Sequence, residues 1–150
     1  MLTASQHESL ISEGLCHHEA FEYKKALTLF RKAYKETPLC SVAQYNYANT
    51  LFMLERYDES SEILRSLLAT PDAVLRVGCP LQENPRPFKL DANYLLFLNT
   101  LYKSGNWEEA YPFAENHLSL RSRGLKSIWS IAEIRKEILR LKDEFCEESN

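Results

Sequence analysis

The 150-residue sequence lacks the long apolar run and the basic excess that would point to a membrane or to nucleic acid. No apolar stretch approaches the roughly 20 residues that a transmembrane helix needs, and residues 1–8 do not have the pattern of a signal peptide. The 18 basic side chains stand against 21 acidic ones, which leaves a net charge of −3. Nucleic acids and anionic membranes both require a clustered basic surface. The sequence therefore predicts no nucleic-acid binding, no membrane insertion and a cytoplasmic location.

The four cysteines are widely scattered and contain no Cys-x-x-Cys pair. They are Cys16, Cys40, Cys79 and Cys146. Two disulfides are arithmetically available, with three ways to connect them. Scattered thiols in a cytosolic protein are usually reduced, because that compartment keeps them so. We therefore expect four reduced thiols.

Motifs of catalysis and of metal binding are also missing. The sequence has no glycine-rich phosphate loop, no Gly-x-Ser-x-Gly and no His-Glu-x-x-His. Cys16, His17 and His18 are consecutive, but successive residues of a helix point about 100° apart and cannot share one ion locally. His7 and His18 would share a similar helix face, yet lie about 16 Å apart along its axis. The sequence predicts no enzyme, no catalytic residue, no metal site and no cofactor.

What the sequence does contain is a repeated stretch. Tyr23 recurs as Tyr57, 34 residues later, and Trp107 follows Tyr57 after 50 residues, 16 more than the first interval. Small and apolar residues of the first copy recur in the second with the same spacing. Gly14, Ala26, Phe30, Ala33 and Pro38 are matched by Ala48, Ser60, Leu64, Leu67 and, one residue early, Pro71. A period of 34 residues is typical of a repeat built from two helices.

Apolar residues at intervals of three and four predict a helix pair in each copy. The expected helices span about 3–19 and 23–36, then 40–55 and 57–69, then 91–104 and 107–120. Gly105 can take the left-handed angles that end a helix. Between the second and third pairs, Asn84-Pro85-Arg86-Pro87 cannot be ordinary helix interior, so we expect an insertion there.

The 34-residue register with shared turns resembles the tetratricopeptide repeat family. The first copy agrees best, with Gly14, Ala26, Phe30 and Pro38 at family positions. The resemblance implies an all-α fold, a right-handed α–α superhelix of three helix pairs with an insertion between pairs two and three and a C-terminal solvating helix. A single domain would span residues 1–150. Its repeats would cover about 7–38, 41–72 and 91–122, with the insertion at 73–90 and the capping helix at 125–146.

In this family the first helices of successive units line a concave groove that holds extended peptides or partner helices. By resemblance, the groove positions here are mostly apolar and aromatic, with two amides that can donate to and accept from a peptide backbone. They are Ile11, Leu15, His18, Tyr45, Asn49, Phe52, Leu95, Asn99 and Tyr102. We therefore expect an adaptor or scaffold that binds an extended peptide or an amphipathic helix of a partner protein. A small chaperone for a secreted or assembly-prone client is the alternative.

Three narrower hypotheses also come from the sequence. Relatives that grip the C-terminal carboxylate of heat-shock chaperones use a clamp of cationic and asparagine side chains, of which only Asn46 is present here, so we do not expect that role. The insertion, with Arg86 and Phe88, is an alternative recognition element. Apolar residues of the last helix, spaced three and four apart, fit a cap, and they also fit a coiled-coil seam through which a homodimer would form.

Overall fold

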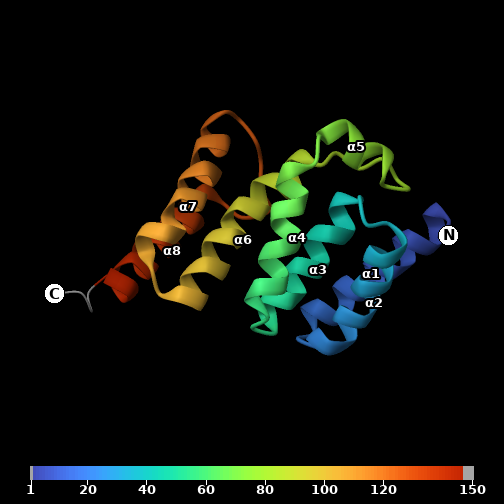
Figure 1. The fold of residues 1–150 in the computed structure, drawn as a ribbon, viewed down its shortest axis with the longest axis horizontal. Helices are drawn as coiled ribbons and strands as arrows, with labels where there is room; N and C mark the ends of the chain where they lie inside the picture. The colour runs from blue at the N-terminus through green and yellow to red at the C-terminus, as the bar shows by residue number, and fades with distance from the viewer. Residues whose placement is uncertain (1, 147–150) are drawn as a thin grey trace.

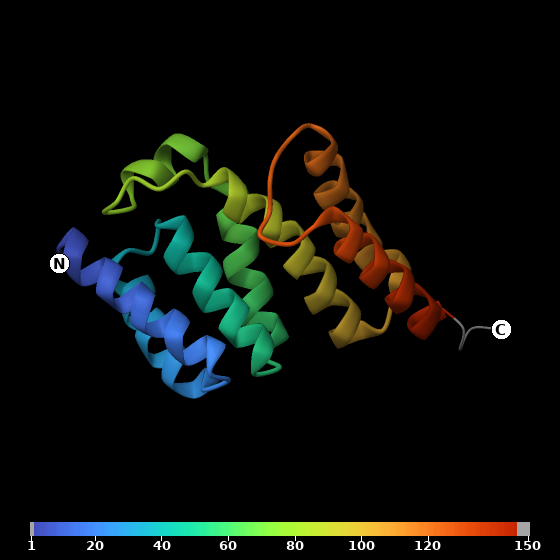
Figure 2. The same cartoon turned by 180° about the vertical axis from the view of Figure 1, so that it is seen from behind.

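The computed structural model describes residues 2–146, and this range contains eight helices and no strand. The helices are α1 Ala4–Glu19, α2 Tyr23–Glu36, α3 Ser41–Met53, α4 Tyr57–Ala69, α5 Asp72–Val77, α6 Arg86–Ser104, α7 Trp107–Ser122 and α8 Ile131–Cys146. They form two layers. In Figure 1 α2, α4 and α7 lie nearer the viewer, and Figure 2 shows the other layer of α1, α3 and α6, which α8 continues. The predicted all-α fold is confirmed.

The three helix pairs are α1 with α2, α3 with α4 and α6 with α7, and they stack in that order along the molecule (Figure 1). Gly105 ends α6 with a φ of 68°, as expected. Two bounds differ from the prediction. α6 begins five residues earlier, at Arg86. Pro87 lies in the first turn of this helix, where backbone N–H groups have no partner within the helix, so a proline is tolerated there. α8 begins six residues later, at Ile131, after a loop.

Small side chains allow the helices of a pair to cross closely. A Cβ atom added to Gly14 of α1 would lie 2.5 Å from Cε1 of the Phe30 ring in α2, well inside contact distance. In the second pair Ala48 and Ser60 are both fully buried, and the Ser60 hydroxyl donates to the Ala48 carbonyl over 2.7 Å. The repeated small positions of the sequence are therefore the points of closest approach between paired helices.

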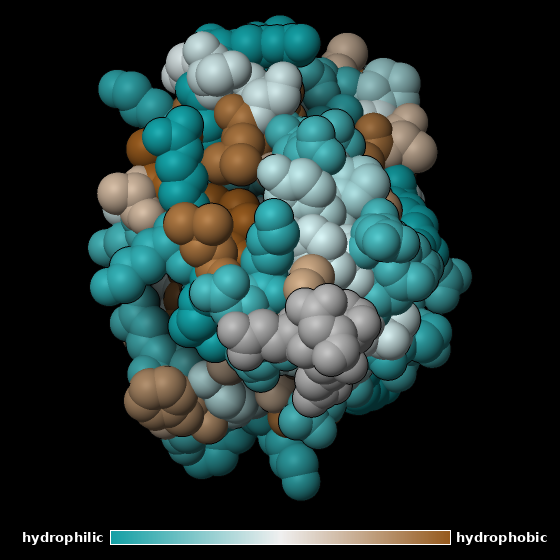
Figure 3. Space-filling view, turned by 90° about the vertical axis from the view of Figure 1, so that its left-hand side faces the viewer, coloured by the Kyte–Doolittle hydropathy of each residue, from teal (hydrophilic) through white to brown (hydrophobic). Residues whose placement is uncertain are grey.

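The last helix covers the apolar end of the stack. Ile134, Ile138 and Leu141 of α8 are buried against a cluster that includes Phe97 of α6 and Ala114 of α7. Figure 3 views the molecule from this end, where mostly polar side chains surround a narrower apolar strip. This arrangement is that of a solvating helix. The predicted seam packs within its own chain, so the homodimer stays a prediction and would need another face of α8.

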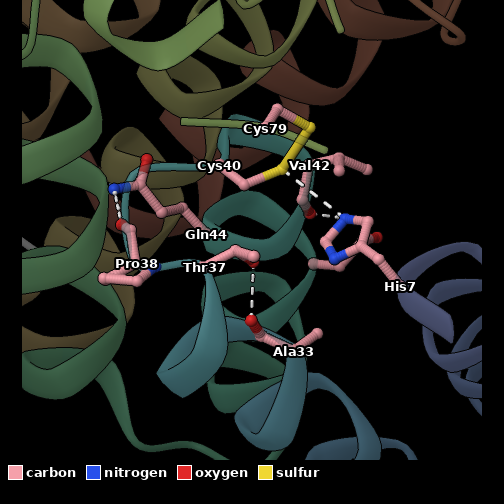
Figure 4. Close-up of a disulfide and its surroundings, with 9 residues drawn as sticks. His7, Ala33, Thr37, Pro38, Cys40, Val42, Gln44 and Cys79 are labelled. Atoms are coloured by element: carbon pink, nitrogen blue, oxygen red, sulfur yellow. Dashed lines mark hydrogen bonds between the residues drawn. A yellow bond between two sulfur atoms is a disulfide. The ribbon is translucent and has the colours of Figure 1, made fainter. Parts of the chain in front are cut away.

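The insertion folds back along one edge of the stack, where it contains the short helix α5 (Figure 1). Leu75 of α5 is fully buried, and a Cβ added to Gly78 would lie 2.6 Å from that of Leu39. This close packing brings Cys79 to the start of α3, where it forms a disulfide with Cys40 (Figure 4). The expectation of four reduced thiols is wrong for this pair, because the two residues meet only through tertiary packing.

Replacement of Leu64 by alanine tests the core of the stack. Leu64 of α4 is fully buried, whereas Leu139 of α8 is 64% exposed and serves as a matched control. We expect Leu64→Ala to lower the free energy of unfolding by about 2–5 kcal/mol, because it removes buried methyl groups and leaves a cavity. Leu139→Ala should change it by no more than about 0.5 kcal/mol. Urea denaturation followed by circular dichroism measures both, and equal losses would contradict the assignment of Leu64 to the core.

Candidate functional site

Figure 2 shows the layer made by α1, α3 and α6. Residues of these three helices line two cavities. The first, of about 330 Å³, is closed on one side by Trp129 and α8, and we call it the α8 cavity. The second, of about 400 Å³, is closed by residues 126–128 of the loop before α8, and we call it the loop cavity. Both cavities share the walls of the same three helices. The chain after α7 therefore crosses this face and contributes to both.

Six of the nine groove residues predicted from the sequence line one of these cavities. His18, Asn49, Phe52 and Leu95 line the α8 cavity, and Leu15 and Tyr45 line the loop cavity. The repeat register therefore identified residues that lie together in space. That they bind a peptide stays a prediction.

The other three predicted residues line neither cavity. Ile11 is buried in the main core. Asn99 is fully buried and its amide donates to the Ser60 hydroxyl over 2.9 Å, so it faces the α4–α6 contact and not the groove. Tyr102 packs against the rings of Phe52 and Phe145 at the far end of α6. The sequence placed Asn99 by repeat register alone, whereas the side chain satisfies its amide inside the stack.

Sequence reasoning missed the contribution of the last loop and helix. The Tyr94 hydroxyl of α6 donates to the Glu137 carboxylate of α8, and burial raises the pKa of Tyr94. The Trp129 ring lies 5.9 Å from that of Tyr94, and the Trp129 carbonyl accepts a hydrogen bond from Arg121. These contacts fix α8 as a wall of its cavity. No local pattern signals the two contacts of Tyr94, because they join residues 35 and 43 positions apart along the chain.

The α8 cavity carries negative charge beside apolar walls. Glu133 and Glu137 line it, and among the described residues no lysine or arginine does. Burial lowers the pKa of His18, so this ring is neutral at physiological pH. Its Nε2 atom is buried and has no hydrogen-bond partner among the residues that the structure describes. A buried polar atom of this kind normally has a partner. The cavity therefore suits a ligand with a basic or hydrogen-bonding group next to apolar ones.

The loop cavity is held together by a buried carboxylate. The Ser127 hydroxyl donates to Oδ1 of Asp91 over 2.7 Å and so attaches the loop to α6. Burial raises the pKa of Asp91 to about 6. Tyr45 lies in the same wall, with its hydroxyl buried and unpartnered among the described residues, and its ring is 6.0 Å from that of Phe88.

The proposed recognition element of the insertion is divided by the fold. Phe88 lies in the first turns of α6 and lines the loop cavity. Arg86 instead makes an ion pair with Asp72, 3.5 Å away, on the edge that carries α5. Phe88 is therefore part of the same face as the other cavity residues, and Arg86 is not.

Replacement of Asp91 by asparagine should make stability less dependent on pH. The folded state holds a proton on Asp91 up to about pH 6, whereas an unfolded carboxyl releases it near pH 4, so stability falls as pH rises through this window. We expect Asp91→Asn to be more stable than the parent by about 2–3 kcal/mol at pH 7.5. The gain should largely vanish near pH 4. Urea denaturation at both pH values measures it, with the exposed Asp143→Asn as control, and a gain independent of pH would contradict the assignment.

Within the described residues, no helix has the length and apolar character required to span a membrane.

Comparison with protein families matches residues 17–73, from the end of α1 to the start of α5, to the tetratricopeptide repeat. No curated protein and no solved structure matches the chain. Such repeats serve in protein–protein interaction and are typically not enzymes. The matched residues and the stacked helix pairs show that this chain is similar to the tetratricopeptide repeat over residues 17–73, and its fold is consistent with that repeat along the remaining helix pair.

Proposed function

We propose that this protein is an adaptor that binds an amphipathic helix or an extended segment of a partner protein across the α8 cavity and the loop cavity. The family's general role in protein interaction supports the proposal. The two cavities share helices α1, α3 and α6, so one continuous segment can reach both. We call the two cavities together the groove.

One observation carries the proposal. Each cavity is lined by one residue that carries a buried polar atom with no partner among the described residues: His18, through Nε2, at the α8 cavity and Tyr45, through its hydroxyl, at the loop cavity. An unsatisfied buried polar group costs about 1–3 kcal/mol. A bound polypeptide that displaces the side chains covering these atoms would offer backbone and side-chain groups to satisfy both. The unsatisfied atoms therefore favour a ligand with hydrogen-bonding groups over purely apolar packing.

The lining also indicates what the ligand presents. Leu15 is 39% exposed and Ile128 is 85% exposed at the loop cavity, which favours apolar side chains there. Glu133 and Glu137 favour a lysine or arginine at the α8 cavity. We expect apolar residues at helical spacing with a basic residue at one end.

A small chaperone for a secreted or assembly-prone client is the second candidate. The exposed Leu15 and Ile128 favour it, because such side chains would shield an apolar segment of an unassembled client. A chaperone keeps its isolated client soluble, whereas an adaptor binds a segment of a protein that is already folded. Partner proteins that co-purify with this protein can each be expressed with it and without it. A partner that is soluble only in its presence indicates a chaperone, and a partner that is soluble alone indicates an adaptor.

Selection of short random peptides displayed on phage, followed by fluorescence anisotropy with the enriched peptides, tests the groove. Leu15→Lys places a charge in the loop cavity, and Leu139→Lys makes the same change at an exposed position of α8 that lines neither cavity. We expect Leu15→Lys to raise the dissociation constant at least about tenfold, equal to about 1.4 kcal/mol. Leu139→Lys should leave it unchanged.

Charge reversal at Glu133, which lines the α8 cavity, is an independent test of the groove. Glu133→Lys should lower the affinity for peptides that carry a basic residue and leave the affinity for peptides without one unchanged. Circular dichroism confirms that each variant is folded. Binding that survives both Leu15→Lys and Glu133→Lys would show that the peptide lies elsewhere.

A further inference from the structure

A cluster of three metal-ligating side chains lies outside both cavities. His7 of α1, Cys40 directly before α3 and Cys79 shortly after α5 bring their ligand atoms within 4.8 Å of one another. Figure 4 shows the His7 ring beside the Cys40–Cys79 disulfide, with Nε2 at 3.6 Å from Sγ of Cys40. None of the three lines the groove. The cluster therefore has no part in the proposed peptide binding.

These three side chains are almost completely shielded from solvent. His7 and Cys40 are fully buried and Cys79 is 2% exposed. The Nδ1 atom of His7 has no hydrogen-bond partner among the described residues. An apolar side chain would fill the same space without an unsatisfied nitrogen, so packing alone does not account for an imidazole here.

We propose that, once the Cys40–Cys79 disulfide is reduced, His7, Cys40 and Cys79 bind one Zn²⁺ ion. Thiolate and imidazole donors are the set that zinc takes in proteins. A tetrahedral ion with bonds of about 2.3 Å to sulfur and about 2.0–2.1 Å to nitrogen separates the two donors by about 3.6 Å. That is the distance between Nε2 of His7 and Sγ of Cys40. The fourth position is left for a water molecule.

Charge balance favours a divalent ion at this depth. Two thiolates and one Zn²⁺ sum to zero net charge, and a neutral imidazole adds none. A monovalent ion would leave one negative charge in a buried site, which is costly. Hard cations such as Mg²⁺ prefer oxygen ligands and would not compete for two sulfurs.

The disulfide and the metal site are alternative states of the same two sulfur atoms. Reduction adds two electrons and two protons to the disulfide and gives two thiols; a dithiol reductant becomes its own disulfide, and a phosphine takes the oxygen of one water molecule and becomes the phosphine oxide. Zinc binding then releases both protons, one from each thiol. A small-molecule disulfide reverses the step: the two thiolates lose two electrons and form the sulfur–sulfur bond, the oxidant takes up these electrons with two protons from water and becomes two thiols, and the ion leaves.

Either state joins the same parts of the fold. The disulfide links the start of α3 to the insertion, and the zinc site adds α1 through His7. A ligand that binds only the folded state stabilises it. We therefore expect the reduced, zinc-loaded protein to have a higher melting temperature than the reduced protein without zinc.

Metal analysis of the full chain tests the proposal. A parent variant with Cys16→Ser and Cys146→Ser retains only the two cluster cysteines. It is reduced with a phosphine without oxygen, loaded with Zn²⁺ and desalted, and we expect about one zinc per chain by mass spectrometry. Co²⁺ used in place of zinc should give the absorption bands of thiolate coordination and of a four-coordinate ion. The oxidised protein should bind neither ion.

Variants assign the ligands. Cys79→Ser and His7→Gln should lose the cobalt bands, whereas His17→Gln, at a partly exposed histidine of the same helix, should retain them. If a variant loses its helical circular dichroism, it is set aside. The test then rests on the zinc content of the oxidised and reduced forms of the parent variant. The proposal is overturned if the reduced parent, with both thiols open to alkylation, retains no zinc. It is equally overturned if Cys79→Ser or the oxidised chain retains as much, which would mean an adventitious ion only.

Discussion

The close crossing of paired helices is the constraint on which the rest of this structure depends. Phe30 fills the space that a side chain at Gly14 would occupy, and Ser60 hydrogen-bonds to the carbonyl of Ala48. A single pair of this kind cannot bury its apolar surface alone, so the pairs must stack. Stacking places α1, α3 and α6 in one layer, and the two cavities lie on the outer face of that layer. The groove is a consequence of that requirement.

The chain after α7 decides how much of this face stays open. The loop before α8 is attached to α6 by the Ser127–Asp91 hydrogen bond, and Trp129 packs on Tyr94. α8 then covers the apolar end of the last pair. The same segment therefore ends the stack and supplies one wall of each cavity. Its carboxylates give the α8 cavity the negative character on which the proposed ligand chemistry rests.

The insertion has a comparable role at the N-terminal half of the stack. It is too short to form another helix pair, but α5 buries Leu75 and brings Cys79 beside Cys40 and His7. Residues from three parts of the chain thus form a buried sulfur and nitrogen cluster. In a repeat protein most contacts join neighbouring units, and this cluster is an additional link between the first two units and the insertion.

The sequence by itself determined the helix pairs, their order and six residues that line the two cavities. A 34-residue period and the small positions such as Gly14 and Ala48 are local signals, and helix packing obeys them. It misplaced Asn99, since repeat register does not show which neighbour satisfies a buried amide. Only the tertiary structure decided how α8 closes the groove and that His7, Cys40 and Cys79 meet. Those contacts depend on the paths of the loop and the insertion, which follow no repeat.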